Sequence, residues 1–160
     1  MQLRERGFEV SGLFYNPNIH PLEEYNKRRQ AAQTFSKSVG IEMFYPEYAK
    51  EDFFYAIGGR PVTPFRCHAC WTLRLKMTAK TAKEKGFDTF TTTLLASPYQ
   101  DQELLKKIGT TIGKEEGVEF YYQDFRPGFR KAHNEARLQG LYMQKYCGCV
   151  YSQIERDKKK

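Results

Sequence analysis

Several motifs that would mark common enzyme classes are missing from this sequence of 160 residues. It has no G-x-x-x-x-G-K-[ST] and no G-x-G-x-x-G segment, so no phosphate-binding motif supports ATP hydrolysis or nicotinamide binding. The nucleophile elbow of serine hydrolases is absent too. No apolar run approaches the roughly 20 residues of a membrane span, and no signal-peptide pattern opens the chain. We therefore expect a cytoplasmic protein.

Cysteine is scarce, and its four copies form two close pairs, Cys67 with Cys70 and Cys147 with Cys149. Thiols stay reduced in the cytoplasm, so paired cysteines there more often bind a metal or do redox chemistry than form disulfides. Gly148 permits the tight backbone that chelation by near neighbours requires. Four thiolates suit tetrahedral zinc or an iron–sulfur cluster, and unbound thiols are the third reading. The spacing leaves these three open.

Positive charge and aromatic rings are abundant. The chain carries 26 Lys and Arg against 19 Asp and Glu, a net charge of +7, with 11 Tyr and 12 Phe. This composition would suit a nucleic acid, through attraction to phosphate and stacking on bases. The plainer reading is a generally basic protein whose count is inflated by the lysine tail at 158–160.

The hydrophobic pattern alternates between strand and helix along the chain. Strands are predicted at 8–14, 41–45, 118–122 and in the segment "FDTFTTTLL", and helices from Leu22, at 48–57, from about Trp71 to Gly86, after Ser97-Pro98, and at 129–142. This order predicts one α/β domain over residues 1–160, Rossmann-like, with a mostly parallel sheet and helices on both faces.

In a parallel sheet, ligands bind beyond the carboxyl ends of the strands. Three segments follow predicted strands: "YNPNIHP", "TLLASPY" and "QDFRPGF". We expect them to gather at one rim, joined by the loop bearing the first cysteine pair. They contain His20, a candidate for a phosphate or substrate contact, and Asp124 with Arg126, for which a surface ion pair is the default. Arg66 adds a permanent positive charge beside the first thiols.

Five segments together resemble the QueH family of epoxyqueuosine reductases: "LFYNPNIHPLEEY", "RCHACWTLRL", "FDTFTTTLLASPY", "DFRPGF" and "YCGCVYS". The resemblance covers almost the whole chain in the family's order. It implies a Rossmann-like fold and the last step of queuosine synthesis, removal of the epoxide oxygen from epoxyqueuosine in tRNA. It also implies a [4Fe–4S] cluster beside a mononuclear iron, which favours iron–sulfur over zinc. The implied cluster ligands are Cys67, Cys70, Cys147 and Cys149.

Members of this family usually begin with a strand and a Cys-Cys motif, whereas Met1 here falls inside the helix that follows. The four remaining thiolates suffice for one cluster but not for a second iron as well. We therefore expect the chain as it stands to be an epoxyqueuosine reductase of weak or no activity.

The implied reaction needs a proton donor, an electron donor that the sequence does not identify, and a tRNA-binding surface. The candidate proton donors are Tyr146, Asp124 and His20. The candidate phosphate contacts are Arg28, Arg29, Arg66, Arg126, Arg130 and Lys131. The alternatives are a non-enzymatic RNA-binding module stapled by zinc through the same thiols and, more remotely, a thiol redox protein.

Overall fold

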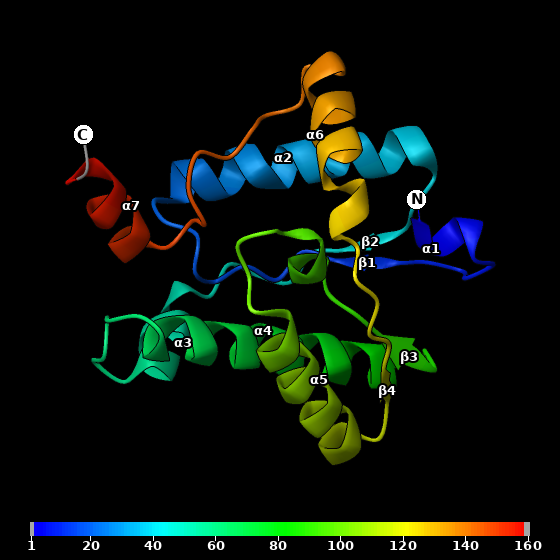
Figure 1. The fold of residues 1–160 in the computed structure, drawn as a ribbon, viewed down its shortest axis with the longest axis horizontal. Coiled ribbons are helices and arrows are strands. Elements are labelled where there is room, and N and C mark those ends of the chain that lie inside the picture. The colour runs from blue at the N-terminus through cyan, green and yellow to red at the C-terminus, as the bar shows by residue number, and fades with distance from the viewer. Residues whose placement is uncertain (1, 159–160) are drawn as a thin grey trace. The chain divides into compact units, whose positions relative to one another are not determined.

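A computed structural model describes residues 2–158 of the chain (Figure 1). Met1, Lys159 and Lys160, on which the N-terminal expectation and part of the charge argument fall, lie outside the described residues. The chain divides into two compact units, one of residues 1–55 with 132–160 and one of residues 56–131. Each unit is described by itself below.

The first unit contains a pair of parallel strands, β1 (Gly12–Leu13) and β2 (Met43–Phe44), and the long helix α2 (Leu22–Val39) between them in sequence. Gly12 pairs with Met43 and Leu13 with Phe44. The unit also contains α1 (Gln2–Glu5), α7 (Val150–Asp157), and most of α3 (Lys50–Ile57) and α6 (Phe129–Leu138). A strand, a helix and a parallel strand in succession form the βαβ unit that the alternating pattern predicts.

The core of this unit is aromatic. Phe14 and Tyr25 are buried with ring centroids 5.4 Å apart in an edge-to-face arrangement, and Ile19 completes the cluster. The hydroxyl of Tyr48 donates to the carbonyl oxygen of Ile19 at 2.6 Å. These contacts tie the segment after β1 to the helix that follows it.

Helix α2 has well-defined signals at both of its ends. Glu23 and Glu24 lie in its first turn, where carboxylates favour the positive end of the helix dipole. At its other end Gly40 adopts a left-handed conformation, with φ of 62°, and the next amide, from Ile41, donates to the carbonyl of Ser36. This is the usual glycine stop of an α-helix.

The second unit is built on two helices that pack together, α4 (Phe65–Glu84) and α5 (Gln102–Glu116). Its strands, β3 (Thr89–Phe90) and β4 (Glu119–Phe120), form another parallel pair. Helix α5 approaches β4 closely, because a side chain at Gly109 would lie 2.5 Å from the ring of Phe120. Helix α4 buries Trp71, Leu75, Ala79 and Ala82, the face predicted from the sequence.

Two short 3₁₀ helices follow these strands: η1 (Thr93–Ala96) after β3 and η2 (Arg126–Gly128) after β4. They lie next to each other, so the segments "TLLASPY" and "QDFRPGF" do meet beyond parallel strands. The segment "YNPNIHP" belongs to the other unit, and its place at a common rim stays a prediction.

The α/β class and the parallel strand pairing are confirmed, while several boundaries differ. The predicted strands shorten to two residues each, since only these carry ladder pairing in the described chain. The third one stops at Phe90 because the chain turns into η1. The next helix begins after Asp101, whose carboxylate caps the amide of Leu104 at 2.9 Å, rather than after Ser97-Pro98. The single-domain interpretation stays a prediction.

Helix α7 was not predicted from the sequence, and α4 begins six residues earlier than its apolar face indicates, at Phe65. The cysteines of the first pair therefore lie inside a helix and not ahead of it. Over residues 2–158, no helix is both long enough and apolar enough to span a membrane.

Candidate functional site

The second cysteine pair lies on a tight turn that leads into α7. Gly148, between the two cysteines, has φ of 113°, a backbone conformation that residues other than glycine rarely adopt. Cys147 is exposed, whereas Cys149 is 3% exposed. The turn therefore presents one sulfur to the surface and holds the other inside.

Ser152 contacts both residues of the pair. The thiol of Cys147 donates to Ser152 Oγ at 3.0 Å, and that hydroxyl donates to the carbonyl of Cys149 at 3.1 Å. The backbone amide of Ser152 in turn donates to Cys149 Sγ at 3.3 Å, so Cys149 caps the first turn of α7. A thiol at a helix N-terminus lies where anionic sulfur is favoured.

The turn is attached to α2 by a buried guanidinium. Arg28 Nη1 donates to the carbonyl of Cys147 at 3.1 Å, and Nη2 donates to the carbonyl of Tyr146 at 2.9 Å. Arg28 Nε donates to Glu24 Oε1 at 2.8 Å, one helical turn away. The second carboxylate oxygen of Glu24 accepts from the hydroxyl of Tyr142 at 2.5 Å, and this hydrogen bond raises the pKa of Tyr142.

His20 is attached to the same turn through its backbone. Its amide donates to the carbonyl of Gly148 at 2.8 Å, and its carbonyl accepts from the hydroxyl of Tyr146 at 2.5 Å. Its ring lies beside Phe53 and Phe54, with centroids 5.6 and 5.0 Å away. Both ring nitrogens are buried without a hydrogen-bond partner among the described residues. Burial lowers the pKa of His20, so the neutral imidazole is favoured.

Tyr146, a candidate proton donor, is held in place by contacts of both its ring and its hydroxyl. Its ring lies under two guanidinium groups, with Arg28 Cζ 5.2 Å and Arg156 Cζ 5.1 Å from the ring centroid. Burial raises the pKa of its phenol. Its proton is engaged with the carbonyl of His20, which leaves the proton-donor role a prediction.

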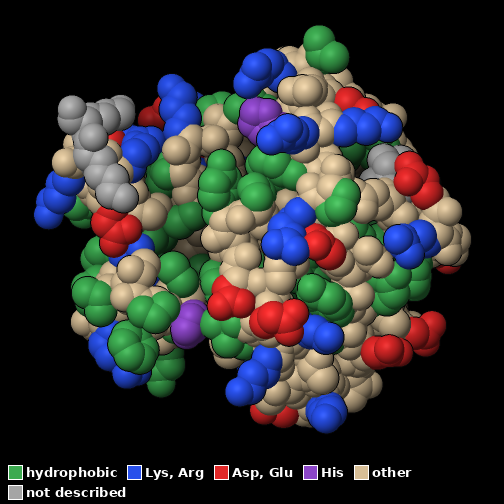
Figure 2. Space-filling model, in the orientation of Figure 1, with side chains coloured by type: hydrophobic (Ala, Val, Ile, Leu, Met, Phe, Trp, Pro, Cys, Tyr) green, Lys and Arg blue, Asp and Glu red, His purple; other side chains and the backbone are tan. Residues whose placement is uncertain are grey.

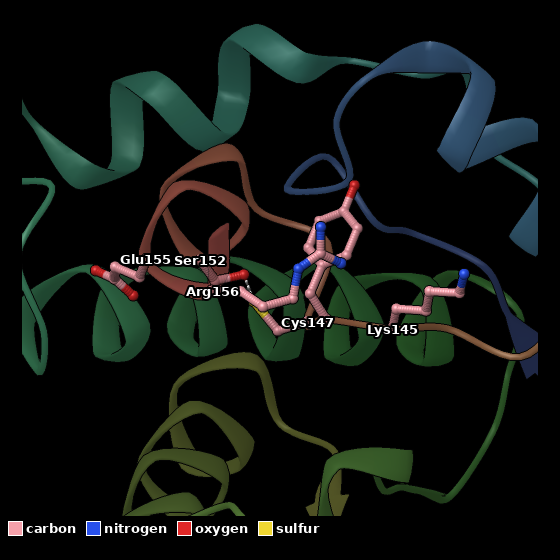
Figure 3. A pocket seen from close by; sticks show the side chains of 6 residues that line it. Lys145, Cys147, Ser152, Glu155 and Arg156 are labelled. Atoms are coloured by element: carbon pink, nitrogen blue, oxygen red, sulfur yellow. Dashed lines mark hydrogen bonds between the residues drawn. The ribbon is translucent and has the colours of Figure 1, made fainter. Parts of the chain in front are cut away.

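An open hollow of about 320 Å³ adjoins this turn (Figure 3). Its lining comes from the turn and from α7: Lys145, Tyr146, Cys147, Ser152, Glu155 and Arg156. In Figure 3, Cys147 and Ser152 lie together at its centre, with Lys145 and Glu155 on either side. The exposed sulfur of the pair is therefore reachable from a surface depression.

The first cysteine pair lies in the opening turns of α4, in the other unit. Cys67 and Cys70 are three residues apart in a helix and so share one face. Cys70 is buried and Cys67 partly exposed. The first turns of a helix therefore hold this pair, and its role as a ligand pair stays a prediction.

The donor chemistry of the four thiols fits an iron–sulfur cluster, since thiolates are its usual ligands. Each unit by itself supplies two of the four, and none of the four forms a disulfide. Within residues 2–158, no three His, Cys, Asp or Glu side chains are grouped so as to hold a metal ion. Binding of one centre by both pairs is therefore carried forward as a proposal.

Asp124 is poorly suited to donate a proton. Arg126 grips its carboxylate with Nε at 2.8 Å and Nη2 at 2.7 Å, and the amide of Arg126 adds a third hydrogen bond at 3.0 Å. These bonds lower the pKa of Asp124 to about 2, chiefly through the guanidinium. At neutral pH Asp124 is an ionised partner of Arg126, the default that its sequence already suggested, and we withdraw it as an acid.

Two of the predicted phosphate contacts are buried in the chain. Arg28 is 8% exposed and engaged as described above, and Arg66 is 3% exposed, with Nη1 donating to the carbonyl of Pro61. A guanidinium that the chain buries cannot also contact an external phosphate, so neither is proposed as a tRNA contact. The remaining predicted contacts are exposed, apart from the partly buried Arg29: Arg126, Arg130 and Lys131.

Arg29 lies over the ring of Tyr45 at 5.2 Å, and the charge of Arg126 is shared with Asp124. Arg130 and Lys131 are exposed residues of α6 and stay candidates for phosphate contacts. On the face shown in Figure 2, basic and acidic side chains are interspersed. Net charge alone therefore does not define the binding surface.

Sequence reasoning missed Glu24, Gln144 and Ser152 as parts of this site. The signal for Glu24 was its spacing of four residues from Arg28, which allows an ion pair on a helix. Ser152 was detectable as the third residue after Cys149, a spacing typical of helix caps. Nothing in the local sequence marks Gln144, because its partner lies 116 positions away.

The protein thus has an α/β fold with two cysteine pairs. One pair lies on a helix and the other on a Cys-Gly-Cys turn. The model of one family, epoxyqueuosine reductase QueH, matches residues 1–155. The chain belongs to that family.

Curated relatives agree. The chain is 36% identical to the epoxyqueuosine reductase QueH of Thermotoga maritima, over 92% of this chain and 81% of that protein. It is also 36% identical to the QueH protein of Dehalococcoides mccartyi, over 96% and 84% of the two chains. With the Helicobacter pylori protein of that name it shares 36% identity over 91% of this chain but 42% of the relative.

Proposed function

We propose that this protein reduces epoxyqueuosine to queuosine in tRNA. The observation that carries the proposal is the family match over residues 1–155, a span that contains all four cysteines. Removal of the epoxide oxygen as water consumes two electrons and two protons and leaves a carbon–carbon double bond. A tRNA substrate also suits the cytoplasmic location expected from the sequence.

The proposed cluster ligands are Cys67, Cys70, Cys147 and Cys149. A [4Fe–4S] cluster bound there would supply the electrons one at a time, from an external donor that the sequence does not identify. If all four thiolates bind the cluster, no cysteine of this chain is left for a second iron. The exposure of Cys147 at the hollow supports access to this pair from solvent.

For proton delivery, His20 is the candidate that the contacts favour. Its ring nitrogens have no partner among the described residues, and its backbone is bonded to Gly148 in the middle of the cysteine turn. Tyr146 lies next in line, since its hydroxyl donates to the carbonyl of His20. In this role the ring first takes up a proton, because the neutral imidazole that burial favours is too weak an acid, and the imidazolium then donates an N–H proton to the oxygen released from the epoxide.

The direct test is anaerobic purification followed by an assay on tRNA that carries epoxyqueuosine, with a chemical reductant. We expect a brown protein with broad absorbance near ~400 nm, and slow formation of a product nucleoside lighter by one oxygen atom, in keeping with the weak activity expected from the sequence. Cys147→Ser should lose both, while Lys27→Gln, changed on the exposed face of α2, should keep both. The QueH protein of Thermotoga maritima serves as the positive control.

A colourless protein that holds one zinc and leaves the nucleoside unchanged, while the positive control converts it, would overturn the proposal. That outcome would favour the zinc-stapled RNA-binding module.

A further inference from the structure

The buried guanidinium on α2 has no part in the proposed chemistry, yet it is one of the most heavily hydrogen-bonded groups of its unit. Arg28 is 8% exposed and carries a permanent charge, and burial of such a charge is costly unless protein groups replace its water. Its partners are therefore informative about what holds it there.

Those partners are concentrated on the segment that carries the second cysteine pair. Besides the carbonyls of Tyr146 and Cys147, Nη1 also contacts Gln144 Oε1 at 2.9 Å. Nε is occupied by Glu24. Three nitrogens of one planar fork thus hold four acceptors, an arrangement that a lysine ammonium cannot reproduce.

The same turn is held from a second direction. The carbonyl of Gly148 accepts from the amide of His20, and a Cβ at Gly148 would lie 2.8 Å from Ile19 and 3.0 Å from Arg28 Nη1. The turn is therefore clamped between α2 and the segment after β1. Nothing larger than a hydrogen atom fits at its centre.

We infer that Arg28 is a positioning residue: through the carbonyls of Tyr146 and Cys147 it sets the direction in which Cys147 and Cys149 point. Glu24 orients the guanidinium of Arg28 by accepting a hydrogen bond from its Nε. The inference rests on the proposed function, because a protein that binds a cluster through these thiols needs them held in a fixed direction. Its physical content, a turn held closed by one side chain, is independent of any bound group.

The next pair along the same helix provides a matched control. Lys27 and Glu23 have the same spacing of four residues and an N–O distance of 2.5 Å, but their side chains are 49% and 75% exposed. Within residues 2–158 the ammonium of Lys27 donates to Glu23 and does not hydrogen-bond to the cysteine turn. A change at Lys27 therefore alters an ion pair on α2 without touching the turn.

The test measures alkylation of each cysteine in the metal-free, fully reduced chain of 160 residues, with rates assigned by peptide mapping. In the parent chain we expect Cys147 to react faster than Cys149, since exposure governs access. Arg28→Lys should raise the rate at Cys149 by about tenfold or more, because lost charge-assisted bonds ease local opening. The rates at Cys67 and Cys70 should not change, and Lys27→Gln should match the parent.

Circular dichroism establishes that each variant is folded before labelling. If Arg28→Lys does not fold, Glu24→Gln is measured in its place, with an expected increase at Cys149 of about threefold. Cys149 labelling that is unchanged in the folded variant overturns the inference. An equal increase at Cys67 and Cys70 also overturns it, because the effect is then general loosening.

Failure of this inference and failure of the proposed function can be told apart. If the parent chain binds no cluster but Cys149 is exposed in Arg28→Lys, the positioning role holds and the reductase proposal fails. If the cluster forms and turns over while labelling in Arg28→Lys is unchanged, the reverse is true. Arg28→Lys with an altered cluster absorbance and unchanged tRNA binding would tie the two together.

Discussion

Arg28 Nη2 lies 2.9 Å from the carbonyl oxygen of Tyr146, although the two residues are 118 positions apart in the chain. The distance joins a helix formed early in the sequence to the turn that bears the last two cysteines. Arg28, which was predicted to contact tRNA, is instead part of the frame of the candidate site.

Arg28→Ala should destabilise the protein by about 3–5 kcal/mol, because it leaves the carboxylate of Glu24 buried without its cation. Adding Glu24→Gln should recover part of that loss, since a neutral amide is cheaper to bury. Denaturant unfolding of the single and double variants measures both. Lys27→Ala should leave the midpoint unchanged, and a double variant less stable than Arg28→Ala would contradict this account.

Gly148→Ala should be among the more damaging glycine substitutions in the first unit. The left-handed φ of 113° and the 2.8 Å approach to Ile19 add strain to crowding, for a loss of roughly 1–3 kcal/mol. Gly140→Ala is the matched control, since Gly140 also has positive φ, 66°, but open space around it. In thermal unfolding, the melting temperature of Gly148→Ala should be well below that of Gly140→Ala. Equal melting temperatures would contradict the close packing around Gly148.

Asp124 should titrate with a pKa of about 2, measured by carbon NMR of its carboxylate. The cause is Arg126, so Arg126→Met should move the midpoint up toward the ordinary value of 3.8. Because the pKa is lower in the folded protein, the interaction is fully present above pH 3.8 and is lost as pH falls through 2. Activity near neutral pH should therefore show no inflection from Asp124. A titration midpoint of Asp124 that is unchanged in Arg126→Met would contradict the proposed ion pair.

Reversal of charge at Arg130 and Lys131 tests the tRNA surface. The double variant Arg130→Glu/Lys131→Glu should weaken tRNA binding and reduce the slope of log affinity against log salt by about 1 per lost phosphate contact. The double variant Lys107→Glu/Lys114→Glu, at two exposed lysines of α5, is the charge-matched control. Unchanged affinity in the double variant would remove α6 from the proposed surface.

Local regularities explain how much of the fold was predictable. The apolar spacing of Trp71, Leu75, Ala79 and Ala82 identified the buried face of α4, because helix periodicity is a property of neighbouring residues. The start of the helix after Asp101 was misplaced because Ser97-Pro98 is an equally good local signal, and the chain used it to leave η1.

The sequence by itself determined the α/β class, the parallel pairing, the four cysteines and the resemblance to QueH, since all of these are carried by residue order. Tertiary structure alone decided which arginines are exposed and that the carboxylate of Asp124 is bound by Arg126. It also decided that Glu24, Arg28 and Gln144 lie around the cysteine turn. The physical reason is that a guanidinium has the same charge everywhere in a sequence, whereas its role depends on the acceptors that folding brings within reach.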